Sequence, residues 1–146
     1  MKYTNIVCGV TGSSHSQKAA LEAAALAKQH SSRLTYVYAV DIAFLKAGIG
    51  GLSTSLAENG LEHLGSHILE YAEQLAESQG VVPKKIVRRG NPLEVLKQVL
   101  LEEKGDLLML GHEPRTFFEK ALFKGNVEDH VEELQKQTGA EIMVIR

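Results

Sequence analysis

Two segments of the sequence carry residues suited to binding an anion. The first is Thr11-Gly12-Ser13-Ser14, and the second is residues 111–126. The second segment holds four basic side chains: His112, Arg115, Lys120 and Lys124. Each segment leads into a predicted helix, whose free N–H groups and dipole favour an anion at the helix N-terminus. The two segments predict either a phosphate pocket, if the fold brings them together, or two solvated loops with ordinary helix caps.

Two histidines suggest a different kind of chemistry. His63 and His67 lie four residues apart, a spacing at which two imidazoles on one helix can share a metal ion. The same polar face continues through Glu70, Gln74 and Glu77, which is typical of a solvated helix surface. We therefore predict no metal site.

Hydroxyl and thiol groups do not indicate catalysis. Ser13, Ser14 and His15 are outside the GxSxG context of a catalytic serine, and adjacent residues rarely have triad geometry. Helix capping explains both serines. Cys8 lies in an apolar run, which predicts a buried and unreactive thiol. Because no nucleophile or general base is indicated, we predict that the chain is not an enzyme.

Composition limits the classes of protein and partner. The 146 residues suit one domain, 1–146, and the net charge of −2 provides no basic surface for nucleic acid or an acidic membrane. One cysteine excludes an intramolecular disulfide framework, and no run approaches the roughly 20 apolar residues that span a bilayer. We expect a cytoplasmic protein that contacts neither nucleic acid nor membrane.

The candidate residues must be held in place by strands and helices, which are predicted to alternate along the chain. Apolar and β-branched runs predict strands at 3–10, 33–40, 84–89, 106–110 and 141–145. Between them, helices are predicted at 14–30, 61–78 and 92–103, with a last helix from Asn126 to Gly139. Residues 41–60 are rich in glycine and serine and predict a loop.

Local signals define the ends and faces of these helices. Ser14 and Gln17 fit a capping box at the first helix, and Asn91 with Pro92 fits the start of the third. Gly80 and Gly139 are predicted helix stops. The second helix is expected to bury an apolar stripe: Leu61, Leu64, Ile68, Ala72 and Leu75.

This order predicts an α/β fold, a doubly wound five-stranded parallel sheet with helices on both faces. In such a sheet a ligand binds beyond the carboxyl ends of the strands, where the strand order reverses. If the first strand is central, the loops after the first and fourth strands meet at that point.

The whole chain resembles the universal stress protein family. The resemblance rests on VTGSSHSQKAALEAA after the first strand, on RRGNPLEVL before the third helix, and on GDLLMLGHEPR and GAEIMVIR around the last two strands. It implies the Rossmann-like fold of the adenine nucleotide alpha-hydrolase-like group, with ATP or AMP as the class of ligand. In ATP-binding members, a Gly-x2-Gly-x9-Gly-Ser/Asn pattern follows the fourth strand.

Carrying this pattern over residue by residue gives a partial match. Gly111 is the first glycine, the second falls on Pro114, and Gly125-Asn126 follows after ten residues instead of nine. Proline donates no N–H to a phosphate. The family's adenine-contacting aspartate falls on Thr11, and Val40 matches a residue that lines the base pocket. The nucleotide site predicted from charge and resemblance together comprises Thr11, Val40, Gly111, His112, Arg115, Lys124, Gly125 and Asn126.

Two functions remain open at this stage. The first is a non-catalytic, dimeric stress-response module with a degenerate nucleotide pocket, which Pro114 and Thr11 favour. The second is an ATP- or AMP-binding switch with slow or no hydrolysis. The apolar strand 141–145 predicts a homodimer, because an open strand edge invites pairing and the family commonly uses this strand. Phe117, Phe118 and Phe123 either pack over the sheet end or form a contact patch for a protein partner.

Overall fold

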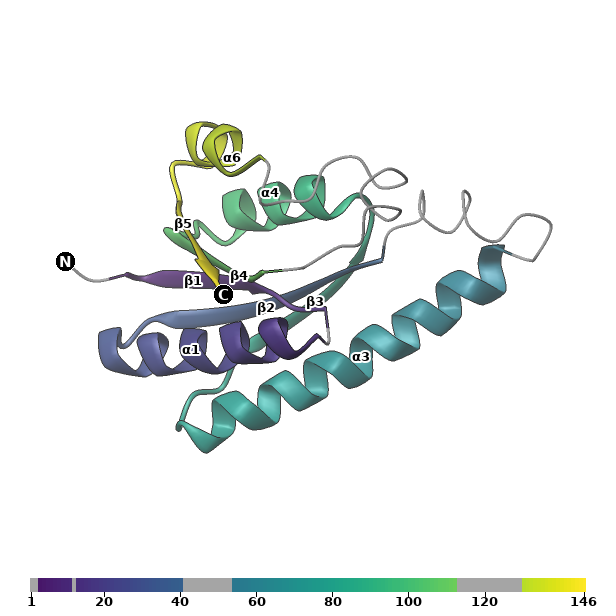
Figure 1. Cartoon of the computed structure of the whole chain (residues 1–146), viewed down its shortest axis with the longest axis horizontal. Coiled ribbons are helices and arrows are strands. Elements are labelled where there is room, and N and C mark those ends of the chain that lie inside the picture. The colour runs from purple at the N-terminus through teal and green to yellow at the C-terminus, as the bar shows by residue number, and fades with distance from the viewer. Residues whose placement is uncertain (1–2, 12, 41–53, 113–129) are drawn as a thin grey trace.

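The computed structural model describes residues 3–11, 13–40, 54–112 and 130–146 (Figure 1). The strands are β1 (Asn5–Gly9), β2 (Arg33–Val40), β3 (Lys84–Arg89), β4 (Leu107–Gly111) and β5 (Glu141–Ile145). The helices are α1 (Ser14–His30), α3 (Thr54–Ser78), α4 (Pro92–Glu102) and α6 (Val131–Thr138). Within the described residues, no helix is long and apolar enough to cross a membrane.

The strands form one parallel sheet in the order β3-β2-β1-β4-β5, with β1 in the centre. Helices α1 and α3 lie on one face and α4 and α6 on the other (Figure 1). Alternate residues of β4 point to opposite faces, so Leu107 and Met109 pack with α1, while Leu108 packs with α4 and α6. The predicted doubly wound α/β fold is therefore confirmed.

Alanines let α1 pack closely on the sheet. The face of α1 toward the sheet buries Ala19, Ala20, Ala23, Ala24 and Ala27. These small side chains bring the helix backbone near β2, where the buried Tyr36 hydroxyl donates a hydrogen bond to the Ala20 carbonyl over 2.7 Å.

Helix α3 differs from the sequence-based prediction in its start and in its buried face. It begins at Thr54, so the predicted loop over 41–60 is wrong for 54–60; residues 41–53 lie outside the described part. A glycine in an exposed helix costs only about 1 kcal/mol, and the helix continues through Gly60. Leu64, predicted to be buried, is 50% exposed.

The buried face of α3 is set by a contact between Gly65 and Tyr38 of β2. A Cβ at Gly65 would lie 2.4 Å from the Tyr38 ring, so this glycine faces the sheet directly. The face that it defines buries Leu69, Ala72 and Ala76. Leu61 and Leu64 therefore lie beside the sheet-facing side of α3 instead of within it.

Most other helix boundaries follow the local signals. The Asn91 side chain accepts hydrogen bonds from the N–H groups of Leu93 and Glu94, as expected of a cap. Gly80 and Gly139 have φ of 82° and 75°, the left-handed conformation of a helix stop. The predicted start of the last helix at Asn126 lies outside the described residues.

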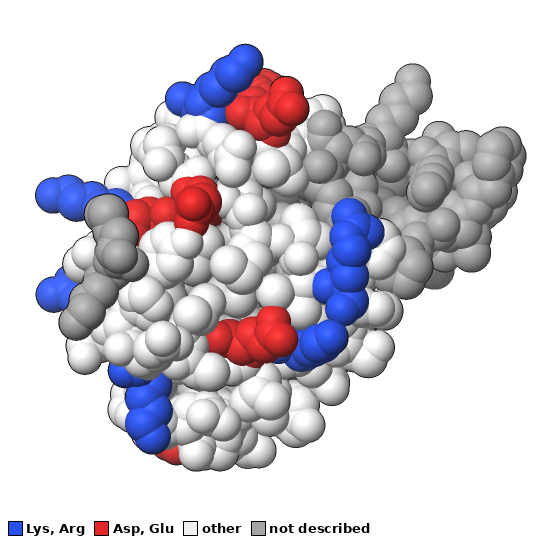
Figure 2. Space-filling view, turned by 60° about the vertical axis from the view of Figure 1, so that its left-hand side comes forward, with Lys and Arg blue, Asp and Glu red and all other residues white. Residues whose placement is uncertain are grey.

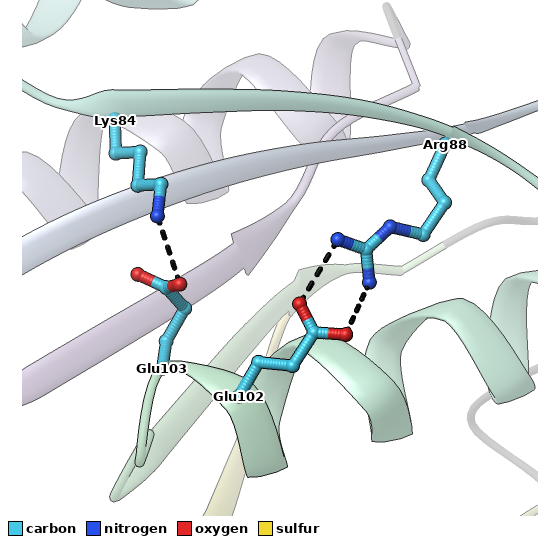
Figure 3. A network of polar contacts seen from close by, with 4 residues as sticks. All are labelled: Lys84, Arg88, Glu102 and Glu103. Atoms are coloured by element: carbon cyan, nitrogen blue, oxygen red, sulfur yellow. Dashed lines mark hydrogen bonds and ion pairs between the residues drawn. The ribbon is translucent and has the colours of Figure 1, made fainter.

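The β3 edge of the sheet is covered by ion pairs on both faces. Lys84 pairs with Glu103, which caps the end of α4, and Arg88 binds Glu102 of α4 through two N–H···O bonds of 2.8 and 3.0 Å (Figure 3). On the opposite face, Lys85 and Arg89 bind acidic residues of α3: Glu73 and Glu62. Charged side chains on an edge strand discourage pairing with another chain.

The β5 edge is different. Ile142 and Val144 are half-buried, and Met143 is 37% exposed. Within the described residues, β5 is paired with β4 alone. This edge therefore presents apolar side chains and backbone N–H and C=O groups to an incoming strand.

Candidate functional site

The strand order fulfils the condition for a ligand crevice. From the central β1 the chain continues to β2 on one side, whereas from β4 it continues to β5 on the other. The strand order thus reverses between β1 and β4, which lie side by side. The carboxyl ends of these two strands are where a doubly wound sheet binds its ligand.

Serines organise the turn from β1 into α1. Ser13 has an extended backbone, and its hydroxyl accepts a hydrogen bond from the Ser16 N–H over 3.0 Å, which makes it the helix cap. The predicted capping by Ser14 and Gln17 is therefore wrong. Ser14 already lies inside the helix, and the Ser16 N–H that needs a partner is three residues after Ser13.

Thr11 lies exposed at this turn with its backbone directed inward. Its N–H donates to the buried Ser16 hydroxyl over 2.8 Å. That N–H is therefore already used within the protein, and the Thr11 hydroxyl donates a hydrogen bond to the Ser13 hydroxyl over 3.3 Å. Sequence reasoning missed Ser16, although its spacing of three from Ser13 was visible in the sequence.

Gly111 ends β4 against the first turn of α1. A Cβ at this position would lie 2.5 Å from the carbonyl carbon and oxygen of His15 and 2.6 Å from the nitrogen of Ser16. These are backbone atoms, which cannot rotate out of the way. Within the described part of the chain, position 111 therefore requires glycine, because the backbone of β4 is in direct contact with the backbone of α1 there.

His112 is part of a cluster of cationic and titratable groups at the ends of β4 and β5. The Arg146 guanidinium, which can only donate, lies 3.2 Å from the His112 Nδ1. The ring of His15 lies edge-on to that of His112, with 5.9 Å between their centroids. Lys18 donates to the Arg146 carbonyl over 3.0 Å. Sequence reasoning singled out His112 but not Arg146, which is distant in the chain and follows no periodic pattern.

Val40 ends β2 at the same edge of the sheet. Its side chain is fully buried, and its carbonyl accepts a hydrogen bond from the Gly90 N–H over 2.8 Å. Thr11, Val40, Gly111 and His112 are thus all at the carboxyl edge, as predicted. The remaining predicted residues lie outside the described part of the chain: Arg115, Lys124, Gly125 and Asn126, together with Pro114 and the aromatic residues Phe117, Phe118 and Phe123.

A cavity of about 200 Å³ lies between α1 and α3, and Val10 and Ser16 of the turn from β1 into α1 are part of its wall. Apolar side chains form most of its wall, among them Ala20, Ile68 and Ala72, and His67 also lines it. None of the eight predicted site residues lines this cavity. In the described residues, His67 lies 3.9 Å from the Glu70 carboxylate on an exposed face.

Charge on the surface does not form a patch of one sign. Figure 2 shows acidic and basic side chains close together in separate small groups, with uncharged surface between them. Within the described residues on this face, the molecule has no extended basic surface of the kind that binds a nucleic-acid backbone.

Comparisons of this sequence with known proteins point to a single family. The sequence model of the Universal stress protein family matches residues 2–145. Universal stress protein MJ0531 from Methanocaldococcus jannaschii is 28% identical over 130 residues, which cover 88% of this chain and 75% of that protein.

Solved structures are similar in fold. Universal stress protein UspA from Lactobacillus plantarum has a TM-score of 0.78 and 21% identity, covering 100% of this chain and 99% of its own. A universal stress protein in complex with cAMP has a TM-score of 0.69 and 21% identity, covering 100% and 98%. At this identity the likeness shows the fold alone.

Proposed function

Because this chain belongs to the universal stress protein family, we propose that it is a non-catalytic, homodimeric stress-response protein with a degenerate nucleotide pocket at the carboxyl ends of β1 and β4. The observation that carries this proposal is the identity and the hydrogen bonding of Thr11. Its N–H is used by Ser16, and its side chain replaces the aspartate that the family resemblance places against adenine. The pocket therefore lacks a charged acceptor for the base at this position.

Titration calorimetry of ATP, ADP and AMP with Mg²⁺ into nucleotide-free protein tests this proposal. We expect dissociation constants above about 1 mM, equivalent to less than about 4 kcal/mol of binding free energy. Incubation with ATP should release no phosphate above the rate without protein. Micromolar affinity would overturn the degenerate pocket, and phosphate release that scales with protein concentration would overturn the non-catalytic assignment.

Restoring the family's carboxylate should strengthen binding. In Thr11→Asp, a charged acceptor can receive a hydrogen bond from the adenine amino group, and such a bond contributes about 1.5–3 kcal/mol. We expect AMP affinity to rise by about tenfold or more in the same titration. The matched control is Thr11→Asn, which has the same shape without the charge. Equal affinity in Thr11→Asp and wild type would show that this position does not limit binding.

The second candidate is an adenine-nucleotide switch. One observation favours it: the cAMP complex of a protein with the same fold. The exposed Thr11 side chain and the N-terminus of α1 lie at the edge where such a ligand would bind. Binding of AMP by wild-type protein at micromolar concentration, without hydrolysis of ATP, would select this candidate.

The dimer and the location belong to the same proposal. Homodimerisation through β5 is supported by its exposed apolar edge, and light scattering should give about twice the 16.0 kDa mass of the chain at micromolar concentration. Protein partners other than a second copy would bind near residues 117–123. We also propose a cytoplasmic location, in keeping with a fold whose one cysteine, Cys8, is buried and which therefore uses no internal disulfide.

A further inference from the structure

The cavity between α1 and α3 has the size of a site for a small molecule. Helices α1 and α3 lie next to each other on one face of the sheet (Figure 1), and the cavity between them has a volume of about 200 Å³. An apolar cavity of about 150 Å³ already holds benzene, whereas pockets for drug-sized ligands have roughly 300–1,000 Å³. The cavity is therefore large enough for a compound with one ring and too small for a whole nucleotide.

Residues of different exposure form the wall of this cavity. Ala20 and Ala72 are buried, and their short side chains leave the space between the helices unfilled. Gln17 is exposed, and Tyr71 is 47% exposed. Because the wall extends from the core to the surface, a ligand has a path into the cavity from solvent.

The Ser16 hydroxyl gives the wall a hydrogen-bond donor. Ser16 is 1% exposed, and its side-chain oxygen accepts a hydrogen bond from the Thr11 N–H over 2.8 Å. A hydroxyl also has one hydrogen to donate, and no described residue accepts that of Ser16. A buried donor without an acceptor is unfavourable. An acceptor atom on a ligand in the cavity would complete the hydrogen bonding of Ser16.

The charge of the wall limits the kind of ligand. Among the described residues, the cavity is lined by no lysine, arginine, aspartate or glutamate. His67 also lines it, but its side chain is 76% exposed, so any charge on this ring is hydrated. Transfer of an ionic group into an apolar space without an opposite charge is costly. The cavity therefore selects an uncharged ligand.

We propose that this cavity binds a small, uncharged and mainly apolar molecule with one hydrogen-bond acceptor, such as a ketone, and that the Ser16 hydroxyl donates to this acceptor. The inference goes beyond the proposed nucleotide pocket, because none of the residues predicted to bind a nucleotide lines the cavity. The apolar wall supplies the burial that drives binding. Ser16 distinguishes a ketone from a hydrocarbon of the same shape.

Three probe compounds of similar size test the proposal. Acetophenone has one ring and one carbonyl acceptor, α-methylstyrene has a CH₂ group in place of the oxygen, and benzoate has a carboxylate. In titrations followed by the ¹⁵N–¹H NMR spectrum of the protein, acetophenone should bind with a dissociation constant below about 1 mM and shift the amide signals around Ala20 and Ala72. We expect α-methylstyrene to bind about two- to tenfold more weakly, and benzoate to show no binding at about 5 mM.

Variants assign the site and the hydrogen bond. In Ser16→Ala, acetophenone and α-methylstyrene should bind with equal affinity, within about twofold, because the donor is absent. The N–H of the exposed Thr11 can then bond to water. Ser14→Ala is the matched control, since Ser14 is exposed in the same helical turn and does not line the cavity. Ile68→Trp fills the cavity and should abolish binding of both compounds. Circular dichroism melts of each variant confirm that it is folded.

Three results would overturn the inference. The first is no binding of acetophenone to wild type at about 10 mM, which is weaker than burial of a ring in such a cavity predicts. The second is binding that shifts only signals outside α1 and α3, or that persists in a folded Ile68→Trp variant. The third is a preference for acetophenone over α-methylstyrene that is the same in Ser16→Ala as in Ser14→Ala, which would show that Ser16 does not contact the ligand.

Discussion

Replacing Gly111 with alanine is expected to lower the free energy of unfolding by about 3 kcal/mol, the upper part of the range for overpacking a well-packed site. The new Cβ would lie 2.5 Å from backbone atoms of His15, well inside van der Waals contact. The end of β4 and the first turn of α1 must then move apart. Urea denaturation monitored by circular dichroism measures the loss.

The control for this change is a second glycine. Gly60 lies in the exposed part of α3, and a Cβ there would meet nothing within 4 Å. Gly60→Ala should therefore stabilise the protein by about 0.5–1 kcal/mol through helix propensity. A Gly111→Ala variant within about 0.5 kcal/mol of wild type would show that the strand and helix are less tightly packed than the structure indicates.

The second large effect concerns the pH dependence of stability. Cys8 is fully buried, and this burial raises the pKa of its thiol to about 12. In the unfolded chain the thiol has its ordinary pKa, so above about pH 9 the unfolded state loses a proton that the folded state keeps. The stability contributed by the protonated thiol is therefore complete below pH 9 and is lost as the pH rises toward 12.

We expect wild type to lose about 2–3 kcal/mol more than Cys8→Ala between pH 8 and pH 11, since each pH unit above 9 costs about 1.4 kcal/mol. Urea denaturation of both proteins at several pH values measures the difference. Burial also raises the pKa of Tyr36, which acts in the same direction, but this residue is present in both proteins. Parallel stability curves for the two proteins would contradict the prediction.

Much of the fold could be predicted from local pattern. The strands Arg33–Val40, Lys84–Arg89 and Glu141–Ile145 have the predicted bounds, because apolar or β-branched runs end at clear turn residues. The start of α3 could not be predicted in this way, because Gly60 resembles a loop residue in sequence. Its buried face depends on the contact between Gly65 and Tyr38, two residues that come together only in the folded sheet.

In the candidate site, too, some features follow from the local sequence and others depend on contacts made only in the folded protein. The sequence placed Thr11 and Gly111 at the ends of strands, but it could bring them together only on the condition that the first strand is central. Four of the six residues from Thr11 to Ser16 carry a hydroxyl group, so the local sequence does not show which of them caps the helix. Ser13 is the cap in the structure, where Ser16 is held by its hydrogen bond with Thr11. The contact of His112 with Arg146 joins residues 34 positions apart.

The unlike edges of the sheet bear on how far assembly can proceed. A fibril that grows by joining sheets edge to edge needs two edge strands in every copy that can pair with another chain, so that each added copy leaves one such edge open. Here the β3 edge is lined by the paired cations Lys84, Lys85, Arg88 and Arg89, and the apolar edge is on β5. Pairing through β5 would cover the apolar edge strand of both copies at once. If two copies pair through β5 as proposed, growth by this strand therefore ends at two chains.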